Sequence, residues 1–460
     1  MKKWFIYNKK AEFRELGDRF GIDQVAVRIL RNREVNSEQQ IESFLNGSLG
    51  DLHSPMLLPD AIRGMNRLDR AINEHRSIRI VGDYDVDGVC ATYILYHGLK
   101  RLGAEVSYAI PDRIRDGYGI NLKIIEEAKR DGIALILTCD NGISAIDELS
   151  AAKDMGISVI VTDHHDVRQN TDPDNGSASG DILPPAAAVI DPKVAGSRYP
   201  FPEICGAVVA WKLLQLLYEK RGMAPEDCMR YLEFAAIATV CDVVKLQDEN
   251  RIIVKYGLRA LQDTQNPGLS ALIEVTGLYR QTAISAYHVG FVIGPCINAG
   301  GRLETAQRAL ELFLEPDRES AVQKAIYLKE LNDARKEMTQ KACLEAFSET
   351  EKHYAGDKVL AVYMPKLHES LAGIVAGRLR EQYYRPSFVI TDTDSGDETG
   401  MAKGSGRSIE GYPMFEKLSE AAPLLGKFGG HPMAAGFSLP RENIDAFRRT
   451  LNKNAGLSEE

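Results

Sequence analysis

The sequence lacks closely spaced cysteines and long apolar runs. Its seven cysteines are scattered and include no Cys-x-x-Cys pair, so neither a zinc knuckle nor a disulfide framework is supported. No uninterrupted apolar stretch approaches the roughly 20 residues that a membrane helix needs. The basic first ten residues hold only a four-residue apolar patch, too short for the core of a signal peptide. We therefore expect a cytoplasmic protein with no membrane partner.

Positive charge is scarce relative to negative charge. The 56 lysines and arginines are outnumbered by 65 aspartates and glutamates, which gives a formal net charge of −9 at pH 7. This balance argues against a protein that coats nucleic acid through one broad basic face. It does not exclude a nuclease, because a carboxylate cluster that binds divalent cations contributes negative charge of its own. The length of 460 residues predicts more than one domain.

Four apolar runs, at 78–82, 133–139, 159–162 and 235–241, end abruptly in acidic or imidazole side chains. They lead, in chain order, to Asp83, Asp85 and Asp87; to Asp140; to Asp163, His164, His165 and Asp166; and to Asp242. Strands buried on both faces read as continuous apolar runs, and open α/β sheets bind ligands beyond the strand carboxyl ends. A single Asp after a strand often only caps the next helix. Because four apolar runs end in such side chains, the pattern favours a metal site on a parallel sheet over four separate helix caps.

The pattern along the chain predicts a two-domain α/β protein. It indicates an N-terminal helical lead-in over 1–60, a doubly wound domain with a parallel sheet over 61–303, a connecting helix broken at Pro316 over 304–355, and a smaller mixed α/β domain over 356–460. Helices are expected at roughly Asp60–Glu74, Gly88–Leu102, Leu122–Arg130, Ile143–Met155, Cys205–Arg221 and Ala372–Tyr383. The polar stretch between Arg168 and Asp181 is expected to be a surface loop.

The types of candidate ligand point to a hard divalent cation. The first three acids are spaced i, i+2 and i+4, so in extended backbone their carboxylates point the same way. Asp140, Asp242 and His164 complete a set of mostly oxygen ligands, which suits manganese or magnesium better than a thiolate-rich zinc site. Two such ions, about 3.5–4 Å apart, would bridge a scissile phosphate and activate water.

The motifs around these residues resemble those of the DHH phosphoesterase superfamily, in their usual order. They are Gly-Asp-Tyr-Asp-Val-Asp-Gly at 82–88, Thr-Cys-Asp-Asn-Gly at 138–142, Thr-Asp-His-His at 162–165 and Cys-Asp-Val-Val at 241–244. Further motifs resemble the RecJ family of single-strand-specific DNA exonucleases, the last two in a segment similar to the companion DHHA1 domain. These are Pro-Asp-Arg at 111–113 with Gly-Tyr-Gly at 117–119, Asn-Ala-Gly-Gly-Arg-Leu at 298–303, Lys-Gly-Ser-Gly-Arg-Ser at 403–408 and Phe-Gly-Gly-His-Pro-Met-Ala-Ala-Gly at 428–436.

The resemblance implies a metal-dependent 5′→3′ exonuclease that hydrolyses single-stranded DNA to mononucleotides in repair and recombination. It implies two divalent cations, with Mn²⁺ preferred and Mg²⁺ as the alternative. Asp85 would serve one ion and Asp140 would be able to bridge, while Asp83 would be a further ligand or would orient one. The other ion would be surrounded by Asp87, Asp140, His164 and Asp242. We expect His165 to contact the scissile phosphate or to place the water; the alternative is a histidine held by Asp166 or a carbonyl.

The resemblance also implies residues that hold the DNA. Arg113, Ser405 and Arg407 would recognise the terminal 5′ phosphate, and His431 would reach the phosphate backbone. Arg302 follows two glycines, which let the backbone approach a phosphate that the guanidinium then binds. A solvated surface turn is the alternative for 403–408. Tyr84 and Tyr118 would either stack on bases or pack against the protein.

The chain departs from the family pattern in two places. Residues 367–370 read Leu-His-Glu-Ser where the family usually has Trp-His-x-Gly, and no segment shows the pattern of the oligonucleotide-binding fold into which these enzymes generally continue. Two other functions stay open: a phosphodiesterase acting on short oligonucleotides or cyclic dinucleotides, and an inactive replication scaffold. We expect a monomer that works with a single-strand-binding protein and a helicase.

Overall fold

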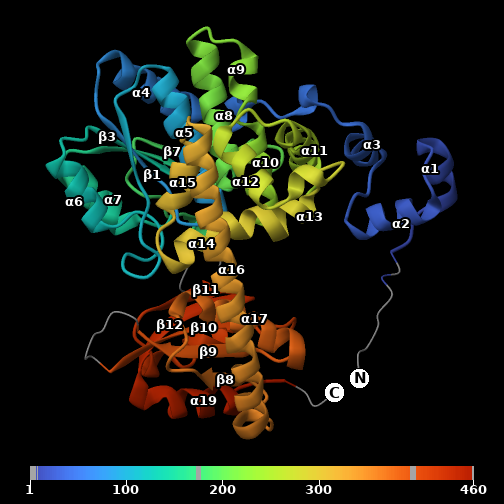
Figure 1. Ribbon diagram of the computed structural model, residues 1–460, viewed down its shortest axis with the longest axis vertical. Coiled ribbons are helices and arrows are strands. Elements are labelled where there is room, and N and C mark those ends of the chain that lie inside the picture. The colour runs from blue at the N-terminus through green and yellow to red at the C-terminus, as the bar shows by residue number, and fades with distance from the viewer. Residues whose placement is uncertain (1–6, 8, 172–177, 394–399, 458–460) are drawn as a thin grey trace. The chain divides into compact units, whose positions relative to one another are not determined.

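The computed structural model describes residues 7, 9–171, 178–393 and 400–457, which divide into two compact units. The first unit comprises Met1–Pro111, Tyr118–Gly301 and Ala306–Lys329, and the second comprises Asp112–Gly117, Arg302–Thr305 and Glu330–Glu460. Two short segments from the first two thirds of the chain therefore belong to the second unit. The long helix α16 (Arg318–Glu349) contributes to both units, and Pro316 separates it from α15 (Gln307–Phe313) (Figure 1). The predicted two-domain α/β fold with a long helix is confirmed.

A five-stranded parallel sheet lies at the centre of the first unit, with strand order β2-β1-β3-β4-β7. Its strands are β1 (Ile78–Val81), β2 (Val106–Ala109), β3 (Leu135–Cys139), β4 (Ser158–Thr162) and β7 (Ala188–Ile190). Val81 pairs with Thr138, and Thr138 pairs with Val161, so β1, β3 and β4 end level with one another. The residues that follow these strands are consequently brought to one edge of the sheet.

Helices cover both faces of this sheet (Figure 1). On one face, α6 (Leu122–Arg130) and α7 (Ile146–Asp154) bury Ile125 and Leu149 against Ile136 of β3. On the other face lie α4 (Ala61–Asn73), α5 (Val86–Arg101), α8 (Gly206–Lys220) and α10 (Leu232–Cys241). Further helices of this unit are α1 (Phe13–Phe20), α2 (Gln24–Asn32), α3 (Glu38–Asn46), α9 (Pro225–Met229), α11 (Asp248–Gln262), α12 (Pro267–Val275), α13 (Ala286–His288) and α14 (Gly294–Leu303), whose last two residues belong to the second unit.

The run at 235–241 makes up most of helix α10, so the prediction that all four apolar runs end at the edge of a parallel sheet was wrong for this one. Helix α10 is enclosed by α5, α8 and α11, and it is apolar around most of its circumference. A helix buried on all sides has no polar face, so its sequence reads like that of a buried strand.

The stretch expected as a loop contains a short hairpin in its described part. Strand β5 (Gln169–Thr171) pairs antiparallel with β6 (Ala178–Asp181), and residues 172–177 lie outside the described residues. The loop prediction was therefore wrong for the two flanking segments. Their polar residues carry no alternating apolar pattern that would indicate a strand.

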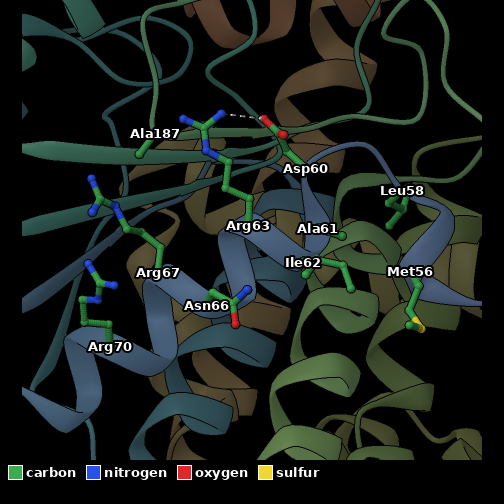
Figure 2. Close-up of a pocket in the computed structure, with 10 residues that line it drawn as sticks. All are labelled: Met56, Leu58, Asp60, Ala61, Ile62, Arg63, Asn66, Arg67, Arg70 and Ala187. Atoms are coloured by element: carbon green, nitrogen blue, oxygen red, sulfur yellow. Dashed lines mark ion pairs between the residues drawn. The ribbon is translucent and has the colours of Figure 1, made fainter.

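Helix α4 turns a row of arginines outward. Arg63, Arg67 and Arg70 line a hollow of about 690 Å³ together with the apolar side chains of Met56 and Leu58 (Figure 2). Arg63 forms an ion pair with Asp60 at 3.7 Å, drawn as a dashed line in the figure. The acids at the strand carboxyl ends are not part of this hollow.

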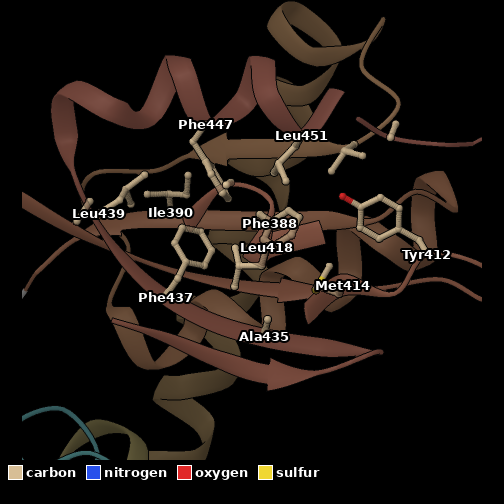
Figure 3. Packing of buried hydrophobic residues seen from close by; sticks show 14 residues of the cluster. Phe388, Ile390, Tyr412, Met414, Leu418, Ala435, Phe437, Leu439, Phe447 and Leu451 are labelled. Atoms are coloured by element: carbon tan, nitrogen blue, oxygen red, sulfur yellow. The ribbon is translucent and has the colours of Figure 1, made fainter. Parts of the chain in front are cut away.

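The second unit is built on a mixed sheet with strand order β11-β12-β10-β9-β8. Its strands are β8 (Leu360–Tyr363), β9 (Ser387–Asp392), β10 (Met401–Arg407), β11 (Phe428–His431) and β12 (Ala434–Pro440); β8 and β9 are parallel and the other neighbours antiparallel. Helix α17 (Ala372–Tyr383) covers one face. Helices α18 (Met414–Ser419) and α19 (Ile444–Lys453) close the other over a core centred on Phe388, Phe437 and Phe447 (Figure 3).

The residues 403–408 lie mostly in strand β10, not in a solvated turn. A Cβ at Gly404 would lie 2.1 Å from the ring of Phe437, and one at Gly406 would lie 2.7 Å from Phe388. The two glycines thus leave space for core rings on one face of the strand. Because side chains alternate along a strand, Ser405 and Arg407 point to the opposite face, towards α17.

Candidate functional site

The three aspartates after β1 are held by different parts of the first unit. Asp83 follows the strand directly, and its Oδ1 accepts a hydrogen bond from Gly119 N at 3.4 Å. Asp85 caps α5, because its Oδ1 accepts from Gly88 N at 3.0 Å. Asp87 lies in the first turn of the same helix. The amino end of a helix favours negative charge, which helps the fold to keep these acids together.

Asp87 is buried and anchored on the start of α8. Its two carboxylate oxygens accept hydrogen bonds from Gly206 N and Ala207 N, both at 2.7 Å. Gly206 also makes room for Asp140, because a Cβ at position 206 would lie 2.7 Å from Asp140 Cβ. Asp140 adopts a left-handed φ of 61°, which is unfavourable for a residue other than glycine. The fold therefore accepts local strain to place the Asp140 carboxylate.

His164 lies among three carboxylates. Its Nε2 is 3.1 Å from Asp140 Oδ1, 3.5 Å from Asp87 Oδ2 and 3.8 Å from Asp242 Oδ2. Burial lowers the pKa of His164 and outweighs the opposing charge of Asp87. The neutral imidazole is the form that binds a metal ion, so this histidine is kept ready to act as a ligand.

The six predicted metal ligands are brought together and form overlapping sets. The potential ligand atoms lie within 4.8 Å of one another in each of three sets: Asp83, Asp85 and Asp140; Asp87, His164 and Asp242; Asp140, His164 and His165. Asp140 belongs to two of the sets and therefore lies between the other groups. Carboxylates with one imidazole suit hard divalent cations, and a cluster of this size has room for two ions about 3.5–4 Å apart.

Burial raises the pKa of three carboxyl groups in this cluster. The pKa of Asp140 is raised well above its usual value by burial and then by the charges of Asp87 and Asp85. Burial also raises the pKa of Asp87, partly offset by His164, and burial together with Asp87 and Asp85 raises that of Asp242 to about 8. Crowded buried carboxylates hold protons until a cation replaces them. The donor set therefore fits metal ions.

His165 is oriented by Asp163 and Tyr118. Its Nδ1 is 2.7 Å from Asp163 Oδ1 and 3.1 Å from the Tyr118 hydroxyl, which donates to Asp140 O at 2.8 Å. Burial by itself lowers the pKa of His165, but the hydrogen bond and charge of Asp163 outweigh it and raise the pKa to about 9. The imidazole is therefore positively charged at neutral pH and can attract a phosphate. The alternative partner Asp166 instead pairs with Lys193 at 2.9 Å.

The sequence did not predict Asp163 or Asp191 as site residues, and it predicted Tyr118 only as a residue that stacks on bases or packs against the protein, not as a partner of His165. Asp163 lies in the same run as the two histidines, but the sequence alone does not show that its side chain points towards His165. Asp191 follows β7 as the other acids follow their strands, and its buried Oδ2 has no hydrogen-bond partner among the described residues. Burial and then the charge of Asp163 raise the pKa of Asp191 to about 7.

In the second unit, Ser405 and Arg407 lie side by side beneath the start of α17. Arg407 Nη1 donates to Ser405 Oγ at 3.3 Å and to Gly406 O at 2.7 Å. A Cβ at Gly373 would lie 2.8 Å from Arg407 Nη2 and 2.9 Å from Ser405 Oγ. The hydroxyl and the guanidinium thus form a compact pair of donors beside a glycine, an arrangement that suits a phosphate group.

Arg113, Arg302 and Lys403 also belong to the second unit. Lys403 Nζ donates to Ile114 O at 3.3 Å, which ties strand β10 to the segment that carries Arg113. Arg302 Nη1 donates to Ser370 O at 3.0 Å, close in sequence to Gly373. Lys403 further pairs with Glu369 at 2.7 Å. The structure therefore gathers cationic residues that are far apart in the sequence into the same unit.

His431 ends strand β11 in the same row of the sheet as Arg407. Arg407 pairs with Ala434 on β12, and Ala434 pairs with His431 on β11. Residues directly opposite in antiparallel strands share a face, and two strand spacings put the histidine about 10 Å from the arginine backbone. His431 is exposed and Ala434 is small, so no large side chain stands between His431 and Arg407 in this row.

Within residues 7, 9–171, 178–393 and 400–457, no helix combines the length and apolar character that crossing a lipid bilayer requires.

Both units match known domain families. Residues 77–239 match the family described as "DHH family, N-terminal domain", and residues 356–456 match the family described as "DHHA1 domain". The two matches cover the metal-ligand cluster up to Thr239 and the strands that carry Ser405, Arg407 and His431.

The chain is similar in sequence to curated bacterial proteins named single-stranded-DNA-specific exonuclease RecJ. It is 36% identical to the protein of Bacillus subtilis (strain 168) over 97% of this chain and 54% of the relative. It is 35% identical to the protein of Salmonella typhimurium over 93% of this chain and 74% of the relative. The chain thus spans about half the length of the first relative and about three quarters of the second.

Solved structures agree with the sequence comparison. RecJ from Thermus thermophilus in complex with Mn²⁺ has a TM-score of 0.80 and 29% identity, and the similarity covers 96% of this chain and 60% of that one. An exonuclease RecJ bound to manganese has a TM-score of 0.74 and 32% identity, covering 89% of this chain and 97% of that one. The chain therefore belongs to the RecJ family of DHH/DHHA1 proteins.

Proposed function

We propose that this protein is a metal-dependent exonuclease that degrades single-stranded DNA from the 5′ end to mononucleotides, in DNA repair and recombination. The observation that carries the proposal is the overlap of candidate ligand sets around Asp140 and His164. Such an overlap suits two-cation hydrolysis of a phosphodiester. The relatives named above are single-stranded-DNA-specific exonucleases, which supports this substrate class.

Two divalent cations, Mn²⁺ or Mg²⁺, fit the cluster. Solved relatives are described in complex with Mn²⁺ and with Mg²⁺, which supports the choice of metal. Asp83 and Asp85 would hold one ion and Asp87, His164 and Asp242 the other, with Asp140 shared. Bound cations would offset the carboxylate charge, polarise the phosphate and lower the pKa of a water molecule.

His165 is the proposed group that contacts the scissile phosphate. It is less buried than His164, and its charged form is stabilised by Asp163. Tyr118 limits the rotation of the imidazole by contacting Nδ1 and by holding Asp140 O. A positively charged imidazole fixed in this position would stabilise the negative charge that develops on the phosphate during hydrolysis.

The second unit would set the polarity of digestion. Ser405 and Arg407 offer a hydroxyl and a planar guanidinium, which together can bind a terminal 5′ phosphate. Arg113, carried on a segment tied to Lys403, would add charge. Arg302 and His431 would hold phosphates of the following nucleotides. Recognition of a terminal phosphate explains why digestion would begin at the 5′ end.

The proposal is tested by Mn²⁺-dependent digestion of a 3′-end-labelled single strand, with 5′-phosphate, 5′-hydroxyl and duplex forms compared. Stepwise shortening from the 5′ end is expected for the native protein, and its loss for Asp140→Ala. The matched control is Asp147→Ala, because Asp147 lies on the helix surface outside the cluster. Cleavage of only very short oligonucleotides or cyclic dinucleotides would replace the proposal by a small-substrate phosphodiesterase. If neither long single strands nor these small substrates are hydrolysed, the result favours an inactive replication scaffold.

A single-strand-binding protein and a helicase as partners, a monomeric state and a cytoplasmic location stay predictions. So do the domain boundaries expected at residues 61, 304 and 356. Size-exclusion chromatography with light scattering measures the oligomeric state directly, and a mass of one chain is the expected result.

A further inference from the structure

A second cavity lies in the first unit and is lined by residues between Tyr93 and Pro316. It measures about 700 Å³ and contains none of the candidate ligands. Side chains from α5, α10 and α15 and from the turn between α11 and α12 line it. Pockets of roughly 300–1,000 Å³ that combine apolar walls with a few convergent polar groups are typical sites for small molecules.

One wall of the cavity consists of aromatic rings. Tyr93 packs against Phe234 with ring centroids 4.1 Å apart, and the ring of His97 stacks on Tyr93 at 5.4 Å and 17°. Burial and then the charge of Arg230 lower the pKa of His97, so this ring is neutral at pH 7. Tyr93 and Phe234 are almost fully buried, at 5% and 1% exposed, so the half-buried, uncharged ring of His97 is the part of this wall that another planar ring can contact.

The carboxylate of Glu233 lies at the bottom of the cavity. Its residue is 5% exposed, and Oε1 accepts a hydrogen bond from the Thr264 hydroxyl at 2.8 Å. No cation pairs with it among the described residues, and burial raises its pKa to about 7. A buried carboxyl group without a counter-charge is costly. Each carboxylate oxygen has two acceptor positions, so Glu233 retains room for at least two further hydrogen-bond donors.

Cationic side chains stand at the rim. Arg230 and Arg259 are exposed, and neither forms an ion pair with another residue in the described part of the chain. Two acids also lie there: Glu315 pairs with Lys324, while Asp263 lies at the end of α11. The two arginines suit an anionic group and repel a polyamine, so the carboxylate at the bottom is not explained by a polycationic ligand.

We propose that this cavity binds a guanine nucleotide. Among the bases, guanine alone presents two adjacent N–H donors, at N1 and N2, on its Watson–Crick edge, and these match the paired oxygens of Glu233. Adenine and cytosine each present a donor beside an acceptor, which would face a carboxylate oxygen and be repelled. The base would lie along the aromatic wall, and the phosphate would meet Arg230 and Arg259.

The position of the cavity suggests a consequence for the proposed nuclease. Tyr93 and His97 lie on α5, whose first turn carries Asp87, and Glu233 lies on α10, which ends at Cys241 directly before Asp242. A ligand in the cavity therefore contacts the two helices that supply metal ligands. If the proposed function holds, the dGMP released from DNA is one such ligand, and the enzyme would sense its own product.

Binding is tested by isothermal titration of the full chain in EDTA with GMP, dGMP, AMP and CMP. One GMP or dGMP per chain is expected, with AMP and CMP about tenfold weaker or more, because a mismatched buried acceptor costs at least that factor. Glu233→Gln should weaken GMP binding about tenfold or more, since an amide offers one donor and one acceptor. The matched control is Glu226→Gln on the neighbouring helix α9, where the side chain is exposed.

Two further variants locate the bound nucleotide. Arg407→Ala removes the proposed phosphate site of the second unit, so the preference for GMP over AMP should persist in this variant if it arises in the cavity. Arg230→Ala should weaken the binding of GMP more than that of guanosine, which lacks the phosphate. This variant also tests the cavity if Glu233→Gln fails to fold. Absence of GMP binding, equal binding of AMP, or insensitivity to both cavity variants would overturn the inference. Because EDTA removes metal-dependent hydrolysis, these results do not depend on whether the protein is an exonuclease.

Discussion

His165 Nδ1 lies 2.7 Å from Asp163 Oδ1, and this contact makes the second histidine of the run a cation. Asp163 is itself held in place, because its Oδ2 accepts from Ile143 N at 2.9 Å and its Oδ1 accepts from His164 N at 2.8 Å. The two adjacent histidines consequently differ in charge: His164 is kept neutral by burial, and His165 is kept protonated by Asp163. One is suited to a metal ion and the other to a phosphate.

Asp163→Asn should reduce activity strongly while leaving the ligands of the cluster in place. The amide cannot stabilise the charged imidazole, so the pKa of His165 should fall from about 9 towards that of a free histidine. Loss of such an orienting partner typically costs about 10- to 100-fold in activity. The rate of digestion and the imidazole pKa, followed by NMR titration, measure the two effects.

Asp166→Asn is the matched control, because Asp166 is adjacent in sequence, has the same charge and is 94% exposed in its side chain. It should change the rate less than twofold, within the range of ordinary surface substitutions. Equal losses for the two variants would show that general charge, and not the contact with His165, determines the effect.

The metal-free protein should lose stability as pH rises through about 8. The pKa of Asp242 is about 8 in the fold and about 3.9 in an unfolded chain, so between these values the folded state binds more protons. Raising pH removes those protons and favours unfolding. The raised pKa values of Asp140 and His165 act in the same direction, since the folded state also holds their protons more tightly.

Thermal unfolding in EDTA at pH 6 and pH 9 checks this prediction. The Tm should be lower at pH 9, and the rise in Tm on adding Mn²⁺ should be larger there, because cations then bind without displacing protons. Asp242→Asn should reduce both differences. A Tm in EDTA that is the same at the two pH values would contradict the assigned protonation.

Gly373→Ala should weaken the preference for a 5′-phosphorylated strand. The new methyl group would lie 2.8 Å from Arg407 Nη2 and 2.9 Å from Ser405 Oγ, so these flexible groups must move away from their present positions. The ratio of kcat/KM for 5′-phosphate and 5′-hydroxyl strands should fall several-fold, with the hydroxyl strand affected less.

Gly377→Ala provides the comparison one helical turn later. There a Cβ would lie 4.0 Å from Arg407 Cγ, an ordinary contact, and alanine is about 1 kcal/mol more favourable than glycine inside a helix. This variant should keep the phosphate preference and gain stability. A similar loss of preference in both variants would mean that α17 and not the donor pair is being disturbed.

The strands beneath the metal-ligand cluster were predictable because their signal is local. The runs ending at Asp83, Asp140 and Asp163 are β-branched and apolar, and they are strands β1, β3 and β4. The run before Asp242 carries the same composition but forms helix α10, because three helices surround it. No feature within 235–241 distinguishes a helix buried on all sides from a buried strand.

The glycine-rich motifs were harder to interpret because their structure is imposed from a distance. Gly404 and Gly406 lie in a strand since rings of Phe388 and Phe437 need the space, and those residues are far away in sequence. The same holds for Tyr118, whose hydroxyl reaches Asp140 O only after the parallel sheet has formed. Sequence spacing predicted the candidate ligands but not the residues that orient them.

A buried ion pair fixes the segment that leads into α4. Lys212 on α8 is 1% exposed in its side chain and lies 2.8 Å from Glu249 Oε2, whose side chain is fully buried. Lys212 Nζ also donates to His53 O at 2.7 Å, and the Tyr199 hydroxyl donates to Glu249. Helices α8 and α11 and the segment around His53 thus meet at one charged contact.

Lys212→Met should destabilise the protein by about 3–5 kcal/mol, because it leaves Glu249 buried without a counter-charge. The double variant Lys212→Met/Glu249→Leu should recover part of this loss, since both charges are then removed together. Lys220→Met on the same helix is the matched control: Lys220 is 37% exposed, pairs with Asp69 at the surface, and should cost about 1 kcal/mol or less. Urea unfolding measures all three variants. Equal costs for Lys212→Met and Lys220→Met would show that the buried pair contributes no more than a surface contact, and that apolar packing alone holds the N-terminal segment on α8.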